Sequence, residues 1–435
     1  MKGKMLFTLL LMIVSVGLAI NWHGVAIAPD GQNCWAVAID TNLVKHSPDF
    51  CQTWYPQVVP DIRVHFDVFF INAQKGWIGS DQGFIFCTTD VGDTWTRQIA
   101  GLAKWAARIS FLDTSYGWAA CGGAIVGRTT NGGGNWDQIF LENPPFPVDS
   151  VDLYGISFVN KRKGWTCAGR YPEYIESIPG QGGDTWYTKG QGYIAVTNDS
   201  GLTWQLQKKD TIYDYYDLKF VDSLTGFVVG GNDRNNLGVV MKTTNGGQTW
   251  QTILIPVQTK ILRALEFVGN RHGWAVGRNG TIVRTTDGGT SWITQQSPVD
   301  TTLFDVDFCD TLRGIIAGNG YVLYTSTGGN PWQSANMNSI KEIKSTFINY
   351  KKSLLYAYPN PFRSQTKLII NNSLKDCRIK IYDVSGKLIK TFNSIISDIN
   401  WNGKDDYNKQ LAAGIYFATL RTKENCFIIP IIYQR

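Results

Sequence analysis

The chain is poor in the residues that most metal and catalytic centres require. Only four histidines occur in 435 residues, and the eight cysteines include no Cys-x-x-Cys pair, so no zinc site is expected. Charged residues make up 17% of the chain. The sequence contains neither a serine nucleophile elbow nor a phosphate-binding loop. We therefore expect no metal and no cofactor.

Long apolar runs are also absent beyond the N-terminus. Met5–Leu18 is apolar and follows two lysines, and Gly17 and Ala19 place small side chains where cleavage after Ala19 requires them. The pattern predicts a signal peptide over residues 1–19 and export by the general secretory route. About 20 residues are needed to span a bilayer, so an uncleaved anchor is the less favoured alternative. We expect no transmembrane span after cleavage.

Positive charge is scarce in most of the chain, although the net charge is +6. Residues 20–332 contain 23 basic and 28 acidic side chains, whereas residues 333–435 contain 16 and 7. A mildly acidic body offers no electrostatic footprint for nucleic acid. We expect no nucleic-acid partner.

Glycine (45) and tryptophan (16) are abundant, and they fall in a repeat. An eight-residue motif with Ser/Thr first, Asp/Asn third, Gly fifth and Trp eighth occurs in seven full or degenerate copies. Its third positions include Asp49, Asp90, Asn131, Asp199, Asn245 and Asp287, and its last positions are Trp54, Trp95, Trp136, Trp204, Trp250, Trp292 and Trp332. A Gly-Trp dipeptide, or a variant of it, recurs once per repeat with the same period as the motif, and we call it the marker. Seven residues before the second residue of that marker stands a phenylalanine: Phe70, Phe111, Phe158, Phe220, Phe267 and Phe308.

The repeat has a period near 41 residues and consists of short apolar runs separated by glycine-rich turns. This pattern is typical of propeller blades with four antiparallel strands. In one unit the expected strands are residues 262–267, 273–277 and 281–285, followed by a fourth after Trp292. The sequence therefore predicts an all-β fold, with a seven-bladed β-propeller over residues 20–332.

The eight-residue motif is interpreted as a device that holds turns. It falls between the third and fourth strands of each blade, where Asp or Asn can accept hydrogen bonds from turn N–H groups. Its glycine permits a positive φ angle, and its tryptophan is expected to pack beneath the hairpin. We assign these residues a structural role and not a catalytic one.

These copies resemble the Asp-box, or bacterial neuraminidase repeat. The longer pattern over residues 273–292 is most similar to the photosystem II stability and assembly factor family of propellers. The resemblance covers about residues 22–332. It implies the fold, and it also implies a protein-binding scaffold with an arginine-bearing face. We carry over the fold and leave the photosynthetic role aside.

Residues 333–353 are polar and predict a linker, and residues 354–435 contain about seven short β-rich runs that fit an immunoglobulin-like β-sandwich. The segment 358–362 (YPNPF) and the later runs KIYDVSGKLIKTF and GIYFATL resemble the C-terminal sorting domain of the type IX secretion system. The immunoglobulin-like module of flagellar hook-capping proteins shares the later runs. The sorting resemblance implies recognition by outer-membrane secretion machinery and a cell-surface or secreted protein. We also hypothesise that Cys377 and Cys426 form a disulfide within this domain.

Candidate site residues are expected on the face opposite the turn motifs, where the connections between the second and third strands lie. One such connection, residues 170–192, carries the largest insertion and is rich in aromatic and acidic residues. The predicted ligand-binding residues are Trp105, Arg108, Arg170, Tyr171, Tyr174, Trp186, Tyr216, Arg263 and Arg278. Glu173, Glu176 and Asp184 are the candidates for a catalytic role.

Three functions remain open. The first is an exported, non-catalytic propeller, expected to be a monomer, that binds a protein or polysaccharide through this face. The second is a secreted glycoside hydrolase, which would need two carboxylates about 5–10 Å apart. The third is a structural or adhesion protein of the cell surface.

Overall fold

The computed structural model describes most of the chain: residues 20–39, 43–60, 63–98, 100–142, 144–145, 147, 152–170, 190–337, 355–358, 363–370, 377–383, 387–395, 399–421 and 426–433. The predicted signal peptide and most of the predicted linker lie outside these residues. The chain divides into two units, Met1–Lys341 and Glu342–Arg435. Among the described residues, no helix has the length and apolarity needed to cross a membrane.

Within the described part of the first unit, seven four-stranded antiparallel sheets follow one another along the sequence. Blades 1 to 3 contain β1 (Trp22–Ile27), β2 (Cys34–Ala38), β3 (Val44–Ser47), β4 (Tyr55–Gln57); β5 (His65–Phe70), β6 (Gly76–Ser80), β7 (Ile85–Thr88), β8 (Thr96–Gln98); and β9 (Ala106–Phe111), β10 (Gly117–Cys121), β11 (Ile125–Thr129), β12 (Asp137–Phe140). A 3-10 turn, η1 (Asp81–Gly83), joins β6 to β7.

Blades 4 to 7 repeat this order. They contain β13 (Asp152–Phe158), β14 (Gly164–Gly169), β15 (Tyr193–Thr197), β16 (Gln205–Lys209); β17 (Asp214–Phe220), β18 (Gly226–Asn232), β19 (Leu237–Thr243), β20 (Gln251–Ile253); β21 (Leu262–Val268), β22 (His272–Gly277), β23 (Ile282–Thr285), β24 (Ile293–Thr294); and β25 (Leu303–Phe308), β26 (Gly314–Gly318), β27 (Tyr321–Thr325), β28 (Gln333–Ser334). The last strand thus lies just beyond the boundary predicted at residue 332.

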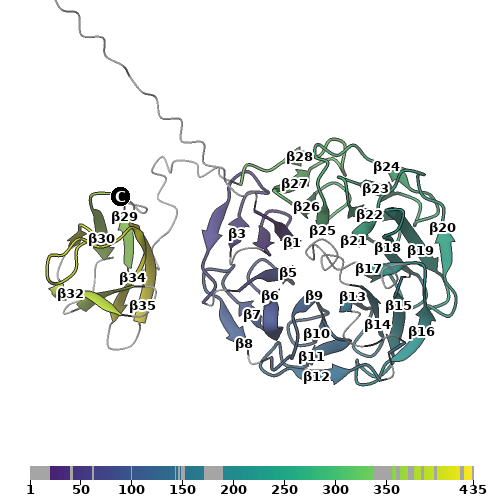
Figure 1. Ribbon diagram of the computed structural model, residues 1–435, viewed down its shortest axis with the longest axis horizontal. Helices are drawn as coiled ribbons and strands as arrows, with labels where there is room; N and C mark the ends of the chain where they lie inside the picture. The colour runs from purple at the N-terminus through teal and green to yellow at the C-terminus, as the bar shows by residue number, and fades with distance from the viewer. Residues whose placement is uncertain are drawn as a thin grey trace, which may run out of the picture. The chain divides into compact units, whose positions relative to one another are not determined.

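The sheets form a ring with the first strand of each blade innermost (Figure 1), and these inner strands line a central channel. Each blade uses one continuous segment, so the ring closes between blades 7 and 1. At this seam Asn21 and Asn319 form an antiparallel bridge, and the N–H of Gly320 donates to the Ile20 carbonyl at 3.1 Å. The seven-bladed propeller predicted from the sequence is confirmed.

Aromatic stacking joins neighbouring blades. Trp77 of blade 2 stacks on Phe111 of blade 3 with ring centroids 3.6 Å apart, and Phe111 meets Trp136 edge-on at 5.9 Å. Both arrangements recur at the other junctions from blade 1 to blade 7, where the stacked pairs are Trp35–Phe70, Trp118–Phe158, Trp165–Phe220, Phe227–Phe267 and Trp274–Phe308. The three sequence markers therefore form one packing unit that spans two blades.

Hydrogen bonds reinforce the same junctions. The indole N–H of Trp77 and the side-chain amide of Gln98 both donate to the Gly132 carbonyl, at 3.2 and 2.9 Å. That carbonyl lies in the turn motif of the next blade. Equivalent pairs donate to the carbonyls of Val91, Gly246 and Gly328. These four turn motifs thus support their own hairpins and also bind the preceding blade.

Within the motif, the acidic residue organises the turn. Asp90 accepts hydrogen bonds from the Thr88 hydroxyl at 2.8 Å and the Thr94 N–H at 2.9 Å, and the Thr88 hydroxyl accepts one from the Gly92 N–H at 2.9 Å. Gly92 has φ of 86°, which favours glycine. Trp250 is half-buried, whereas the tryptophans that end the other six motifs are buried.

The second unit contains β29 (Leu355–Tyr358), β30 (Thr366–Ile370), β31 (Cys377–Asp383), β32 (Leu388–Ile395), β33 (Ile399–Trp401), β34 (Gly414–Arg421) and β35 (Cys426–Tyr433). They form two sheets, β29-β30-β33 and β32-β31-β34-β35. Leu368 and Trp401 of the first sheet pack in one core with Ile381 and Leu420 of the second. This is the small β-sandwich that the sequence predicts.

The order of the second sheet argues against a Cys377–Cys426 disulfide. β34 lies between the strands that carry these residues, with Arg421 paired to Arg378 on one side and to Cys426 on the other. Two interstrand spacings are about 9.6 Å, whereas bridged cysteines keep their Cα atoms within about 7 Å. The side chains of Cys377 and Cys426 lie outside the described part of the chain.

Candidate functional site

The innermost strand of every blade contains a β-bulge near its start. In β5, for example, His65 pairs with Ser80 and Asp67 with Gly79, so Phe66 has no partner of its own. The residues skipped in this way are His23, Phe66, Ala107, Tyr154, Tyr216, Arg263 and Phe304. A bulge re-aims its extra side chain. All seven of these residues line a single cavity at one mouth of the channel.

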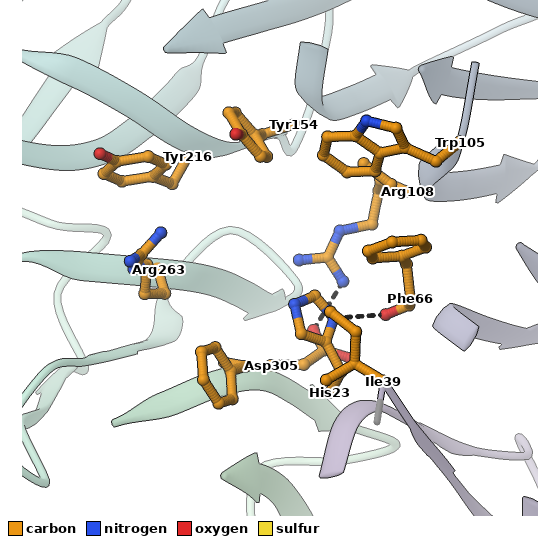
Figure 2. Close-up of a pocket in the computed structure, with 11 residues that line it drawn as sticks. His23, Ile39, Phe66, Trp105, Arg108, Tyr154, Tyr216, Arg263 and Asp305 are labelled. Carbon is orange, nitrogen blue, oxygen red and sulfur yellow. Dashed lines mark hydrogen bonds and ion pairs between the residues drawn. The ribbon is translucent and has the colours of Figure 1, made fainter. Parts of the chain in front are cut away.

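Six rings line this mouth and form what we call the aromatic bowl: His23, Phe66, Trp105, Tyr154, Tyr216 and Phe304. Figure 2 labels all of them except Phe304. Neighbouring rings are in contact around most of the bowl. Centroid distances are 5.1 Å for Phe304–His23, 5.7 Å for His23–Phe66, 4.8 Å for Phe66–Trp105, 5.8 Å for Trp105–Tyr154 and 5.5 Å for Tyr154–Tyr216. Such a wall offers flat apolar faces to a ligand.

Arg263 completes the bowl next to Tyr216. Its guanidinium lies 4.4 Å from the centroid of the Tyr216 ring. Tyr216 is 3% exposed, and neither its hydroxyl nor the buried Nε of Arg263 has a hydrogen-bond partner among the described residues. Burial raises the pKa of the Tyr216 hydroxyl, so it stays protonated. The bowl therefore contains hydrogen-bond donors with unused capacity.

Arg108 forms the floor. Its guanidinium nitrogens lie 2.6 Å from a carboxylate oxygen of Asp305, 3.0 Å from one of Asp217 and 3.4 Å from one of Asp67. These carboxylates come from blades 7, 5 and 2. Burial raises the pKa of Asp67 to about 7 and that of Asp217 to about 6, although the nearby Arg108 acts in the opposite direction.

The same carboxylates cap backbone donors on the inner strand edges. Asp305 accepts from the Val25 N–H at 2.9 Å, Asp67 from Ile109 at 2.6 Å, and Asp217 from Leu265 at 2.9 Å. Each bond links one blade to the next. The aspartates therefore hold both Arg108 and the ring itself.

A second cavity of about 180 Å³ lies along the channel, and Arg108 and Asp305 line it as well. Its other charged residues include Lys219, Glu266 and Asp307. Lys219 and Glu266 are 2.8 Å apart, and Asp307 accepts a hydrogen bond from the Ile27 N–H at 2.6 Å. Burial, with Glu266 nearby, raises the pKa of Asp307 to about 7. No group of three potential metal ligands occurs among the described residues.

The predicted ligand-binding residues separate into three groups. Trp105, Arg108, Tyr216 and Arg263 lie together in the bowl. Arg170 and Arg278 instead form ion pairs near the start of the insertion. Tyr171, Tyr174 and Trp186 lie outside the described residues, as do the catalytic candidates Glu173, Glu176 and Asp184.

Asp214 ties the two ends of the insertion together. Its buried carboxylate accepts hydrogen bonds from the N–H groups of Arg170 and Gln191, at 2.9 and 3.0 Å, and pairs with the Arg170 guanidinium at 3.1 Å. Asp233 pairs with Arg170 at 3.7 Å and with Arg278 at 2.9 Å. Both arginines are therefore engaged in ion pairs within the protein. This suits them to hold the ends of the insertion and leaves them less available to a ligand.

Within the described lining of the bowl, Asp305 is the one carboxylate, and Arg108 holds it. A glycosidase needs a pair. The described lining of the bowl does not present such a pair.

Sequence reasoning missed His23, Phe66, Tyr154 and Phe304. A signal for most of the bowl was nevertheless present, because the bulge residue stands four positions before each marker phenylalanine, as Phe66 stands before Phe70. Reading that position across the repeats identifies Phe66, Ala107, Tyr154, Tyr216, Arg263 and Phe304.

Comparison with known proteins agrees with this architecture. Residues 47–155 and 242–338 match the family model of the photosynthesis system II assembly factor YCF48, and residues 356–434 match that of the secretion system C-terminal sorting domain. No curated protein matches the chain.

Several solved propellers are similar in fold. YCF48 bound to D1 peptide is 17% identical over 72% of this chain and 94% of that one, with a TM-score of 0.53. YCF48 from Cyanidioschyzon merolae is also 17% identical, over 72% and 97%, with a TM-score of 0.53. The WD40 propeller of Doa1 is 14% identical over 71% and 93%, with a TM-score of 0.50.

The sorting domain marks a secreted or surface protein that engages secretion machinery. The chain is thus a β-propeller resembling the photosystem II assembly factor family, joined to a C-terminal secretion-system sorting domain.

Proposed function

We propose that this protein is an exported, non-catalytic binding protein whose propeller holds a protein or polysaccharide ligand in the aromatic bowl. The observation that carries the proposal is the bowl itself, to which six of the seven blades contribute a ring or a guanidinium from a bulge position. Bulges at the same place in every blade direct these side chains to one point, where flat ligands can stack.

The bowl lies on the face opposite the turn motifs. In blade 2, Phe70, Gly76 and Thr88 are paired at one end of the sheet, where the motif begins, whereas the bulge lies at the His65–Ser80 end. The motif residues are engaged in turns and blade junctions. We therefore assign the ligand to the opposite face, where the loops that surround the bowl lie.

A polypeptide ligand has support from one similar structure, since YCF48 was solved bound to D1 peptide. A polysaccharide has support from the rings, which suit the apolar faces of sugars. For export, we infer that residues 1–19 direct the chain through the general secretory route and that residues 354–435 engage the outer-membrane machinery.

The test uses mature protein, residues 20–435, with glycan and peptide arrays followed by calorimetry on the ligands captured. Trp105→Ala and Tyr154→Ala should each weaken binding at least tenfold, because each removes a stacking face. Phe140→Ala is the matched control, since Phe140 is an exposed aromatic on outer strand β12. Unchanged affinity in both bowl variants would refute the proposal.

A reducing-sugar assay on the same glycans tests the hydrolase alternative. We expect no release. Release that disappears in Glu173→Gln, Glu176→Gln or Asp184→Asn would replace the binding function with catalysis and locate the acid.

A further inference from the structure

We propose that the aromatic bowl recognises a carboxylated sugar residue of an acidic polysaccharide, with Arg263 and the Tyr216 hydroxyl binding the carboxylate and the rings packing on the sugar. This inference rests on the proposed binding function and specifies its ligand class.

Arg263 differs from the other arginines near the bowl. Arg108, Arg170 and Arg278 each have carboxylate partners at 2.6–3.7 Å. Among the described residues, no carboxylate lies within ion-pair distance of Arg263. A guanidinium has five N–H donors and no acceptor, so what it needs from a ligand is anionic oxygen, preferably a carboxylate that it can hold with two bonds.

Tyr216 supplies a second donor at the same place. The Tyr216 side chain lines the bowl, and its buried hydroxyl has no partner within the described part of the chain. A buried donor without a partner is unfavourable, and a hydrogen bond to a ligand oxygen would remove that cost. The 4.4 Å stacking of Arg263 on the Tyr216 ring keeps the two donors together.

The carboxylates under the bowl do not cancel the preference of Arg263 for an anionic ligand. Asp67, Asp217 and Asp305 are held by Arg108 and by backbone N–H groups. Burial raises the pKa of two of them to between about 6 and about 7, so their negative charge is incomplete near neutral pH. A ligand carboxylate is expected on the Arg263 side, away from Asp305.

The channel edge favours a sugar over a peptide. A peptide that adds to a sheet edge needs free backbone groups, but the inner N–H groups of Val25, Ile109 and Leu265 are already capped by aspartates. The mouth of the channel is instead lined by aromatic rings, and the centroids of neighbouring rings are 4.8–5.8 Å apart. A pyranose stacks on such faces, and its carboxylate can reach Arg263.

The experiment compares oligogalacturonate and oligomannuronate with their methyl esters by calorimetry on mature protein, residues 20–435. We expect each acid to bind at least tenfold more tightly than its ester. Arg263→Met should remove this preference, and Tyr216→Phe should weaken acid binding about threefold to tenfold. Arg234→Met is the matched control because Arg234 is an exposed arginine on the same face. Thermal melts establish that each variant is folded.

The outcomes separate the two proposals. Equal affinity for acid and ester, with loss of both in Trp105→Ala, overturns the carboxylate inference and leaves the binding function in place. Binding of acidic peptides through Arg263, with no affinity for either oligosaccharide, overturns it in favour of a protein ligand. No binding by any glycan or peptide overturns both.

Discussion

The tryptophan that ends each turn motif shows what single residues contribute to this fold. Trp292 is 5% exposed and meets Phe267 edge-on at 6.1 Å. Trp292→Ala should lower the free energy of unfolding by about 3–5 kcal/mol because it leaves an unfilled core site. Urea unfolding measures the loss.

The neighbouring residue provides the control for this variant. Ile293 is 61% exposed, so Ile293→Ala should cost less than about 1 kcal/mol. If Trp292→Ala abolished ligand binding while the protein stayed fully stable, the motif would belong to the binding site and its structural assignment would be wrong.

The buried thiols give a second prediction for single residues. Cys34, Cys121 and Cys167 are fully buried, and burial raises the pKa of each thiol. Only the thiolate reacts readily with alkylating reagents. Iodoacetamide at pH 8 should therefore label these positions at least about tenfold more slowly in native protein than in urea, as peptide mass spectrometry would reveal. Rapid native labelling would place them nearer the surface.

At the scale of residues, sequence reasoning identified Trp105, Arg108, Tyr216 and Arg263 because bulky or charged side chains on the face opposite the turn motifs are conspicuous. It missed Phe66 and Tyr154, which look like ordinary core residues of a strand. A bulge turns them to the channel, and a bulge depends on strand pairing and not on the identity of the residue.

Arg108 links elements that are far apart in the sequence. It joins strand β9 to carboxylates on β5, β17 and β25. Arg108→Met would leave three carboxylates without their cation and should cost about 3–5 kcal/mol at pH 8. Protonation of Asp67 and Asp217 removes part of the repulsion, so the loss should be smaller at pH 5.

Urea titrations of wild type and Arg108→Met at both pH values provide the measurement, with the exposed Arg234→Met as control. An equal loss at pH 5 and pH 8 would show that Arg108 acts through packing and not through charge.

The channel strands also predict how stability depends on pH. Burial raises the pKa of Asp307 to about 7, well above its value in the unfolded chain. The folded state therefore binds this proton more tightly, and the contribution of this group to stability falls as pH rises from about 4 to about 7. In Asp307→Asn, which keeps an acceptor for the Ile27 N–H, the melting temperature should decline less between pH 5 and pH 8 than in wild type.

Asp137 supplies the comparison. It forms an ion pair with Arg128, and its carboxylate is mostly exposed to solvent. Asp137→Asn should keep the wild-type slope. A slope that is also unchanged in Asp307→Asn would mean that the channel carboxylate stays ionised throughout.

At the scale of elements, the period near 41 residues was enough to predict four strands per blade, because markers such as Phe111, Trp118 and Trp136 make contacts that recur at the junctions from blade 1 to blade 7. The bulges can be located by their fixed distance from the marker phenylalanines, but not from the residue pattern of a single strand. The Phe66 bulge, for example, leaves no trace in the alternation of apolar and polar residues along β5.

At the scale of the whole molecule, the sorting domain and the propeller are separate units with separate cores. Deletion of residues 354–435 should retain the protein in the periplasm, because the segment recognised by the secretion machinery is lost. Fractionation and immunoblotting measure this. The melting temperature of the propeller should change little, whereas unchanged surface or medium levels would contradict the assignment of the tail.

The repeated part of the molecule could be predicted from the sequence, because each copy of the repeat supports the same interpretation. Features that occur once, such as the cysteine pair, could be predicted less well. The seven blades follow from Trp54 to Trp332 by counting. The sheet order argues against the disulfide hypothesis for Cys377 and Cys426, and nothing in the local sequence indicates that β34 separates their strands.

The seam between blades 7 and 1 has a consequence for engineering. Every blade is one continuous segment, and the ring closes through the Asn21–Asn319 bridge. The chain ends could therefore be moved to another blade junction without changing the strand order within any blade. A circular permutant could join Met337 to Ile20 through a short linker and begin instead at the exposed loop near Val257, which is 87% exposed. Such a permutant would present the same bowl with new ends, and a reporter could then be fused far from the original seam.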